Sequence, residues 1–216
     1  MTENGRISPE ALLALLRERR SVRRYRADPV PEAMIEQMLE AGRWAPSANN
    51  LQPWNFIVVR DAVVQGQIAE ATVYTSVPRV RLLESPVLIV LCGVERDRVY
   101  HEFLNGDVAM AALQMMLQAK ALGLGTCWVG GLDRAAIAGL LRIPDFLEVV
   151  CLLTVGFPAE EPAAPSRKPL SEIVHYELYG RGEGEAEGLP GVPVQAPPGP
   201  GERFVNWLRR LLGRPL

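Results

Sequence analysis

Residues 45–54 read Ala-Pro-Ser-Ala-Asn-Asn-Leu-Gln-Pro-Trp and join a predicted helix to an apolar run at 54–59. Pro46 and Pro53 fix φ and lack a backbone N–H, so this stretch is neither a helix interior nor a central strand. Its serine, asparagine and glutamine side chains donate and accept hydrogen bonds without charge, which suits the edge of a planar heterocycle. An ordinary helix-to-strand connection explains the same residues. The stretch alone leaves both interpretations open.

The pattern of apolar residues around this stretch predicts an α+β fold with one core. A chain of 216 residues with 48% hydrophobic content can bury one good core. Strands are predicted at 54–59, 86–92, 123–131 and 149–157, and helices at 9–20, 31–42, 62–71, 105–122 and 134–141. Because these elements follow no strict βαβ rhythm, we expect a central mixed sheet wrapped by helices. The helix at 105–122 is apolar nearly all round, which predicts a buried position.

The composition changes sharply near the end of the chain. Residues 181–201 are rich in glycine, proline, glutamate and alanine, which predicts a linker after a folded domain at 1–180. Residues 202–216 place large apolar side chains at helical spacing opposite arginines, which predicts an amphipathic helix. This helix could dock on protein or lie on a membrane, and we favour protein because one short helix with few basic residues binds lipid weakly.

Charge and cysteine usage exclude several classes of protein. The formal net charge of −2 gives no general attraction to nucleic acid or anionic membranes. Cys92, Cys127 and Cys151 lie in apolar runs without CxxC spacing, which predicts buried thiols and no metal site. The first residues are polar and no apolar run is long enough to cross a bilayer, so a cytoplasmic location is expected.

Residues 19–26 carry five arginines in eight positions beside a serine. Guanidinium groups match phosphate oxygens bidentately and a hydroxyl adds a neutral donor, so Arg19, Ser21 and Arg23 form a candidate phosphate clamp. A solvated basic surface explains the same residues. Nucleic-acid binding is a third interpretation, although the chain lacks a broad basic face with interleaved aromatic residues.

Two further features are weak by themselves. Gly130 and Gly131 follow a predicted strand, where backbone without Cβ can approach a flat ligand closely or stabilise negative charge; a simple turn explains them equally. Arg167 is a cation next to Lys168, between Pro165 and Pro169.

Taken together, the motifs at 19–25, 45–54, 123–131 and 166–170 closely resemble the FMN-dependent nitroreductase family, over about residues 9–179. The resemblance implies an α+β homodimer with two FMN sites at the subunit interface, each built from both chains. It also implies that hydride passes from NAD(P)H through flavin N5 to a nitroaromatic, quinone or similar small molecule in a ping-pong cycle. No side chain need be catalytic, because the cofactor carries the chemistry.

When the resemblance is applied residue by residue, it implies that both chains contribute residues to each FMN site. Arg19 with its neighbour Arg20, Ser21 and Arg23 would hold the phosphate and ribityl end, joined by Arg167. The loop of the other chain would approach the flavin with Pro46, Ser47, Ala48 and Asn50, while Gly130 and Gly131 would present backbone amides near N5 and O4. Gln52 and Trp54 are interpreted as supports of the loop.

The sequence departs from the family pattern in three places. Pro165 stands where some members carry a basic residue, and Gly130 where many carry an acidic one. The segment at 72–81 does not align, so contacts of Arg79 and Arg81 with FMN stay open, as do weak roles for Tyr74 and His101. An FMN-binding protein without turnover, serving storage, sensing or partner binding, is the alternative function.

Overall fold

The computed structural model describes residues 7–73, 84–94 and 98–182. Contacts between Cα atoms divide the chain into two compact units, Met1–Pro165 and Ser166–Leu216. The predicted helix at 202–216 and all but the first two residues of the predicted linker lie outside the described residues. The domain boundaries at 180 and 201 therefore stay predictions.

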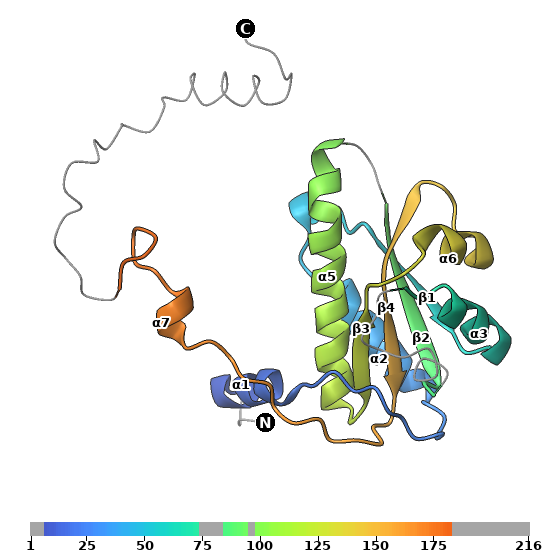
Figure 1. Cartoon of the computed structure of the whole chain (residues 1–216), viewed down its shortest axis with the longest axis horizontal. Helices are drawn as coiled ribbons and strands as arrows, with labels where there is room; N and C mark the ends of the chain where they lie inside the picture. The colour runs from blue at the N-terminus through green and yellow to red at the C-terminus, as the bar shows by residue number, and fades with distance from the viewer. Residues whose placement is uncertain (1–6, 74–83, 95–97, 183–216) are drawn as a thin grey trace, which may run out of the picture. The chain divides into compact units, whose positions relative to one another are not determined.

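One four-stranded sheet forms the centre of the first unit (Figure 1). Its order is β1 (Trp54–Val59), β2 (Val87–Val94), β4 (Leu147–Gly156) and β3 (Gly125–Val129), and every neighbouring pair is antiparallel. The sequence predicts a mixed sheet, but the described sheet is antiparallel. Within the described ranges, parallel pairing is limited to one isolated bridge between Ser21 and Thr126. Continuous apolar runs predict burial on both faces but do not fix strand direction.

Helices cover both faces of the sheet (Figure 1). On one face α2 (Glu32–Arg43) and α5 (Arg98–Ala121) pack against alternate residues of β2, among them Ile89 and Leu91. On the other face α3 (Ala62–Glu70) and α6 (Arg134–Leu141) pack against Leu88 and Val90. Because strand side chains alternate between faces, the single run at 87–92 supplies both halves of the core. The three cysteines are free and buried, as predicted.

Local sequence signals explain where the helices begin. The side chain of Ser8 accepts a hydrogen bond from the Ala11 N–H at the start of α1 (Pro9–Glu18). Asp61 and Asp133 cap α3 and α6 in the same way. Two shorter helices complete the described elements, the 3₁₀ helix η1 (Ala48–Asn50) and, in the second unit, α7 (Leu170–Ile173).

Helix α5 differs from its prediction in two respects. It begins seven residues before the predicted start at 105, and it is not buried all round, because Phe103, Met110 and Leu113 are 49%, 36% and 47% exposed. Its buried side packs tightly against α2, where a Cβ on Gly42 would clash with Met115. The exposed stripe is apolar, so periodicity in the sequence could not separate it from the core-facing side.

Within the described part of the chain, no helix has both the length and the apolar character required to cross a membrane. The same residues contain no group of three or more His, Cys, Asp or Glu side chains placed to hold a metal ion.

Candidate functional site

The arginine-rich segment at 19–26 lies extended beside the adjoining ends of β3 and β4. The Val22 N–H donates to the Thr126 carbonyl at 2.9 Å, and the Arg26 N–H donates to the Phe157 carbonyl at 2.9 Å. The carboxylate of Glu160 accepts hydrogen bonds from the N–H groups of Arg23 and Arg24 at 2.6 and 3.1 Å. The backbone of the segment is therefore fixed from two sides.

Three of the predicted phosphate ligands gather on one side of this segment. Side chains two positions apart in an extended chain share a face, which groups Arg19, Ser21 and Arg23. All three act on the buried thiol of Cys127: burial raises the pKa of this thiol, whereas Arg23, Ser21 and Arg19 lower it. The structure thus brings these three predicted residues together over β3.

Arg19 offers a donor that suits an anion. Its Nη1 is buried, and among the described residues it has no hydrogen-bond partner. Leaving a buried donor unpaired is costly, so a bound oxyanion would remove that cost. Arg20 differs, because its Nη1 donates to the carbonyls of Arg17 and Arg19 at the end of α1.

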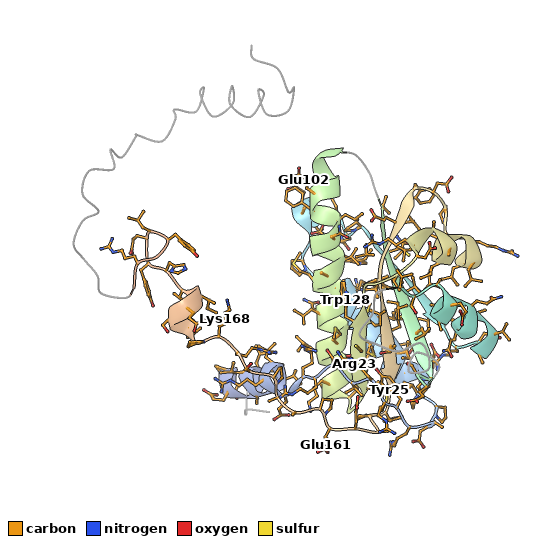
Figure 2. All side chains as sticks on the ribbon, viewed as in Figure 1. Arg23, Tyr25, Glu102, Trp128, Glu161 and Lys168 are labelled. Atoms are coloured by element: carbon orange, nitrogen blue, oxygen red, sulfur yellow. The ribbon has the colours of Figure 1, made fainter. Side chains whose placement is uncertain are left out.

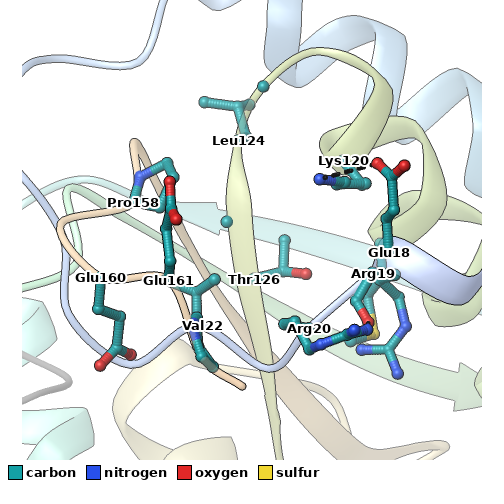
Figure 3. Close-up of a pocket in the computed structure, with 14 residues that line it drawn as sticks. Glu18, Arg19, Arg20, Val22, Lys120, Leu124, Thr126, Pro158, Glu160 and Glu161 are labelled. Carbon is teal, nitrogen blue, oxygen red and sulfur yellow. Dashed lines mark hydrogen bonds and ion pairs between the residues drawn. The ribbon is translucent and has the colours of Figure 1, made fainter. Parts of the chain in front are cut away.

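A cavity of about 320 Å³ opens beside these arginines (Figure 3). One wall carries an ion pair between Lys120 of α5 and Glu18 of α1, with 3.5 Å between Nζ and Oε2. Arg19 and Arg20 line the cavity, but the other predicted site residues of this unit do not, so the cavity covers only part of the predicted site. Its full lining is Glu18, Arg19, Arg20, Val22, Met116, Lys120, Gly123, Leu124, Gly125, Thr126, Pro158, Glu160, Glu161 and Pro162.

The predicted flavin loop is held by a buried carboxylate that the sequence analysis missed. The Ala48 N–H donates to both oxygens of Asp107 on α5, at 3.1 and 3.2 Å, and Asp107 is only 4% exposed. Asn49, Asn50 and Gln52 have φ values of 49°, 56° and 49°. Left-handed backbone is uncommon for residues other than glycine, although asparagine tolerates it best, and such strain is concentrated at ligand-binding loops.

The loop and the arginine segment contact different parts of α5. Ala48 contacts the helix at Asp107, whereas Glu18, the residue before Arg19, pairs with Lys120. A helix rises about 1.5 Å per residue, so these two points are about 20 Å apart along α5. Within one chain, the loop with Pro46, Ser47, Ala48 and Asn50 is not brought together with the phosphate ligands.

Gly130 and Gly131 lie just beyond β3 on the same strand path as Cys127. The Gly131 carbonyl accepts from the Val73 N–H at 2.7 Å, and Gly130 is exposed. A Cβ on Gly130 would come within 3.0 Å of Nε1 of Trp128, which is 36% exposed and labelled in Figure 2. Three residues of strand span about 10 Å, so an elongated ligand can reach from the arginines to the glycine pair.

The remaining predicted residues belong to the second unit or lie outside the described residues. Arg167 belongs to the second unit, where its Nη1 donates to the Ser166 carbonyl at 3.1 Å. Tyr74, Arg79 and Arg81 lie outside the described residues, as does the side chain of His101. Their contacts stay predictions.

Comparison with known proteins identifies the family. The sequence model of the Nitroreductase family matches residues 16–157, which include the arginine segment, the loop and the glycine pair. The chain belongs to the nitroreductase family. The resemblance predicted from the sequence is therefore confirmed. The match ends before Arg167.

This chain aligns with relatives and with solved structures over nearly the full lengths of those proteins. An NADH dehydrogenase of Thermus thermophilus is 31% identical over 191 residues, covering 73% of this chain and 91% of that protein. A putative NADH dehydrogenase/NAD(P)H nitroreductase from Bacteroides thetaiotaomicron is 28% identical with a TM-score of 0.70, covering 80% of this chain and 100% of that one. An FMN-dependent nitroreductase from Clostridium difficile is 27% identical with a TM-score of 0.69, covering 77% and 99%. The predicted α+β nitroreductase-like fold is confirmed.

Proposed function

We propose that this nitroreductase is an FMN-dependent enzyme that passes hydride from NAD(P)H to a nitroaromatic, quinone or similar small acceptor in a ping-pong cycle. The observation that carries the proposal is the buried, unpaired Nη1 of Arg19 beside Ser21 and Arg23. When bound, FMN supplies an atom, N5, that accepts and returns hydride. The residues of this chain bind the cofactor, orient it and leave one of its faces open.

The proposed binding set follows from the donors available. Arg19, Ser21 and Arg23 provide guanidinium and hydroxyl donors for the phosphate and the ribityl chain. Arg20 stays in the set because it lines the cavity beside Arg19, although its guanidinium also binds the carbonyls at the end of α1. Gly130 and Gly131 offer backbone groups to the end of the ligand away from the phosphate. Arg167 is proposed as a further phosphate ligand because the family resemblance implies it.

A homodimer would complete each site. Since the loop and the phosphate ligands are about 20 Å apart along α5, the loop serves the flavin of the other chain in this proposal. Unpartnered apolar surface supports it. No residue of α1 is buried, its Leu12, Leu13 and Leu16 are each more than 40% exposed, and α5 exposes Phe103, Met110 and Leu113. A second copy would cover such surface.

The visible absorption spectrum of purified protein tests the proposal. Bound flavin should bleach when NADH or NADPH is added without oxygen, and its colour should return when a quinone or nitroaromatic follows. Each half of the cycle is then observed separately, as a ping-pong scheme requires. Flavin that binds but is reduced by neither nicotinamide would favour a storage or sensing role. Protein that rejects FMN would refute the proposal.

A further inference from the structure

A directed chain of hydrogen bonds ends in the middle of the arginine segment. The Cys127 N–H donates to Oγ1 of Thr154 at 3.1 Å, and the hydroxyls of Thr154 and Tyr25 are 2.5 Å apart. Tyr25 donates to the Val22 carbonyl at 2.5 Å, because a carbonyl can only accept. Tyr25 must then accept from Thr154, whose Oγ1 lies 2.5 Å from the Tyr25 hydroxyl oxygen and 3.4 Å from the Cys127 carbonyl oxygen.

This series of hydrogen bonds is buried, and the direction in which each hydroxyl donates is fixed. Tyr25 is 7% exposed and Thr154 is fully buried. Burial raises the pKa of Tyr25 well above its ordinary value, so its hydroxyl stays a donor at every pH at which the protein works. Linked hydrogen bonds in such surroundings strengthen one another. The two strands β3 and β4 are thereby connected to one carbonyl of the segment.

That carbonyl belongs to Val22, which lies between Ser21 and Arg23. The Val22 N–H is held by Thr126 of β3, and the next N–H along the chain is held by Glu160. Without the Tyr25 hydroxyl, the Val22 carbonyl would lose this partner, and the peptide between positions 22 and 23 would keep only the described hydrogen bond from its N–H to Glu160. With one of its two anchors lost, the peptide would hold the side chains of Ser21 and Arg23 on their common face less firmly. Figure 2 labels Arg23 and Tyr25, which come from this one segment.

We propose that Tyr25, held by Thr154, is the positioning residue that keeps Ser21 and Arg23 in the arrangement that binds the FMN phosphate. The inference rests on the proposed function and adds two residues to it that touch no ligand. It predicts a defect confined to the phosphate end of the cofactor. A residue with a merely structural role would instead affect all flavins equally.

The test compares FMN with riboflavin, which lacks the phosphate. Tyr25→Phe keeps the ring and removes only the hydroxyl, and it should weaken FMN binding about tenfold, as expected for loss of one or two buried hydrogen bonds. Riboflavin binding should fall by less than about threefold, because riboflavin keeps the contacts of its ribityl chain and ring but has no phosphate to form charge-assisted hydrogen bonds. Dissociation constants from fluorescence titration of the apoprotein give both values.

Changes at Thr154 keep the test decisive if Tyr25→Phe folds poorly. Thr154→Val should reproduce the loss of FMN affinity, and Thr154→Ser, which retains the hydroxyl, should restore it. The double variant Tyr25→Phe/Thr154→Val should be no worse than either single variant, because both break one chain.

Ser85→Ala provides the matched control. Ser85 is 1% exposed, its hydroxyl bonds the Val87 and Val155 carbonyls, and it accepts from the Val155 N–H. It thus anchors the residue of β4 next to Thr154, and its described hydrogen bonds do not reach the arginine segment. Its loss should lower the melting temperature while leaving the ratio of FMN to riboflavin affinity unchanged.

Two results would overturn the inference, and they differ from failure of the proposed function. If Tyr25→Phe binds FMN as tightly as wild type, or loses FMN and riboflavin affinity equally, the hydroxyl does not position the phosphate ligands. Wild-type protein that binds no FMN would refute the proposed function, and the inference with it.

Discussion

The arginine segment at 19–26 and the loop at 45–54 are two predicted halves of one site that are held in different ways. The segment is attached to β3, to the residue after β4 and to Glu160 by hydrogen bonds of its backbone, and the buried Nη1 of Arg19 has no described partner. The loop carries left-handed residues and is attached to α5 through Asp107. The difference indicates that the backbone of the segment is preformed, whereas the contact of the loop with α5 depends on one buried carboxylate.

Removing an arginine from the arginine segment should give the largest effect. Arg23→Ala is expected to weaken FMN binding about tenfold to a hundredfold, because a charge-assisted hydrogen bond contributes about 1.5–3 kcal/mol. Fluorescence titration of apoprotein measures the change. Arg24→Ala is the control, since Arg24 is exposed in the same segment and its backbone contacts persist. Equal affinity in Arg23→Ala and wild type would show that the phosphate binds elsewhere.

Releasing the loop should give a smaller effect. Asp107→Ala removes the acceptor of the Ala48 N–H, so the loop can leave its strained conformation, and FMN affinity should fall about fivefold to tenfold. Asp107→Asn retains one acceptor oxygen and should lie between this variant and wild type. Titration with FMN measures both.

Glu102→Ala is the control for the loop, because Glu102 lies exposed on the same helix (Figure 2). It should bind FMN like wild type. A loss as large as that in Asp107→Ala would mean that the helix as a whole, and not its contact with Ala48, determines affinity.

The contrast between the two regions also marks what sequence can predict. The helix beginning at residue 9 and the strand at 54–59 depend on near neighbours, and the sequence predicts both. The arginine, loop and glycine motifs likewise point to the family, which is confirmed. Asp107 meets Ala48 across 59 positions, and Tyr25 meets Thr154 across 129. Asp107 is the one acidic residue of the predicted apolar helix at 105–122, which is a visible signal for the first pair. Nothing local marked Thr154 within an apolar strand.

Strand direction and helix burial were missed for a related reason. Apolar content at 87–92 predicts burial, but the partner strand decides whether pairing is parallel, and here all four strands pair antiparallel. On α5, the exposed positions include large apolar residues such as Phe103 and Met110, as the buried side does. Only the positions of other elements, or of a second chain, distinguish the two sides.

Mixing the two variants tests whether the halves of a site come from different chains. In a mixed dimer of Arg23→Ala and Asp107→Ala subunits, exchange across the interface places both defects in one site and leaves the other intact. One FMN per two chains should then bind with wild-type affinity, a twofold change in stoichiometry from wild type. Differently tagged subunits, refolded together and purified by both tags, provide the mixed dimer.

The outcome distinguishes sites built from both chains from sites built from one chain, because the two cases distribute the substitutions differently between the two sites. If loop and arginines of one chain served the same flavin, each site of the mixed dimer would carry one defect, and no site would bind with wild-type affinity. A titration without any tight phase would therefore contradict the exchanged arrangement. A tight phase at half occupancy would instead show that the segment of one chain and the loop of the other form one site. The separation of about 20 Å along α5 would then explain why two chains are needed.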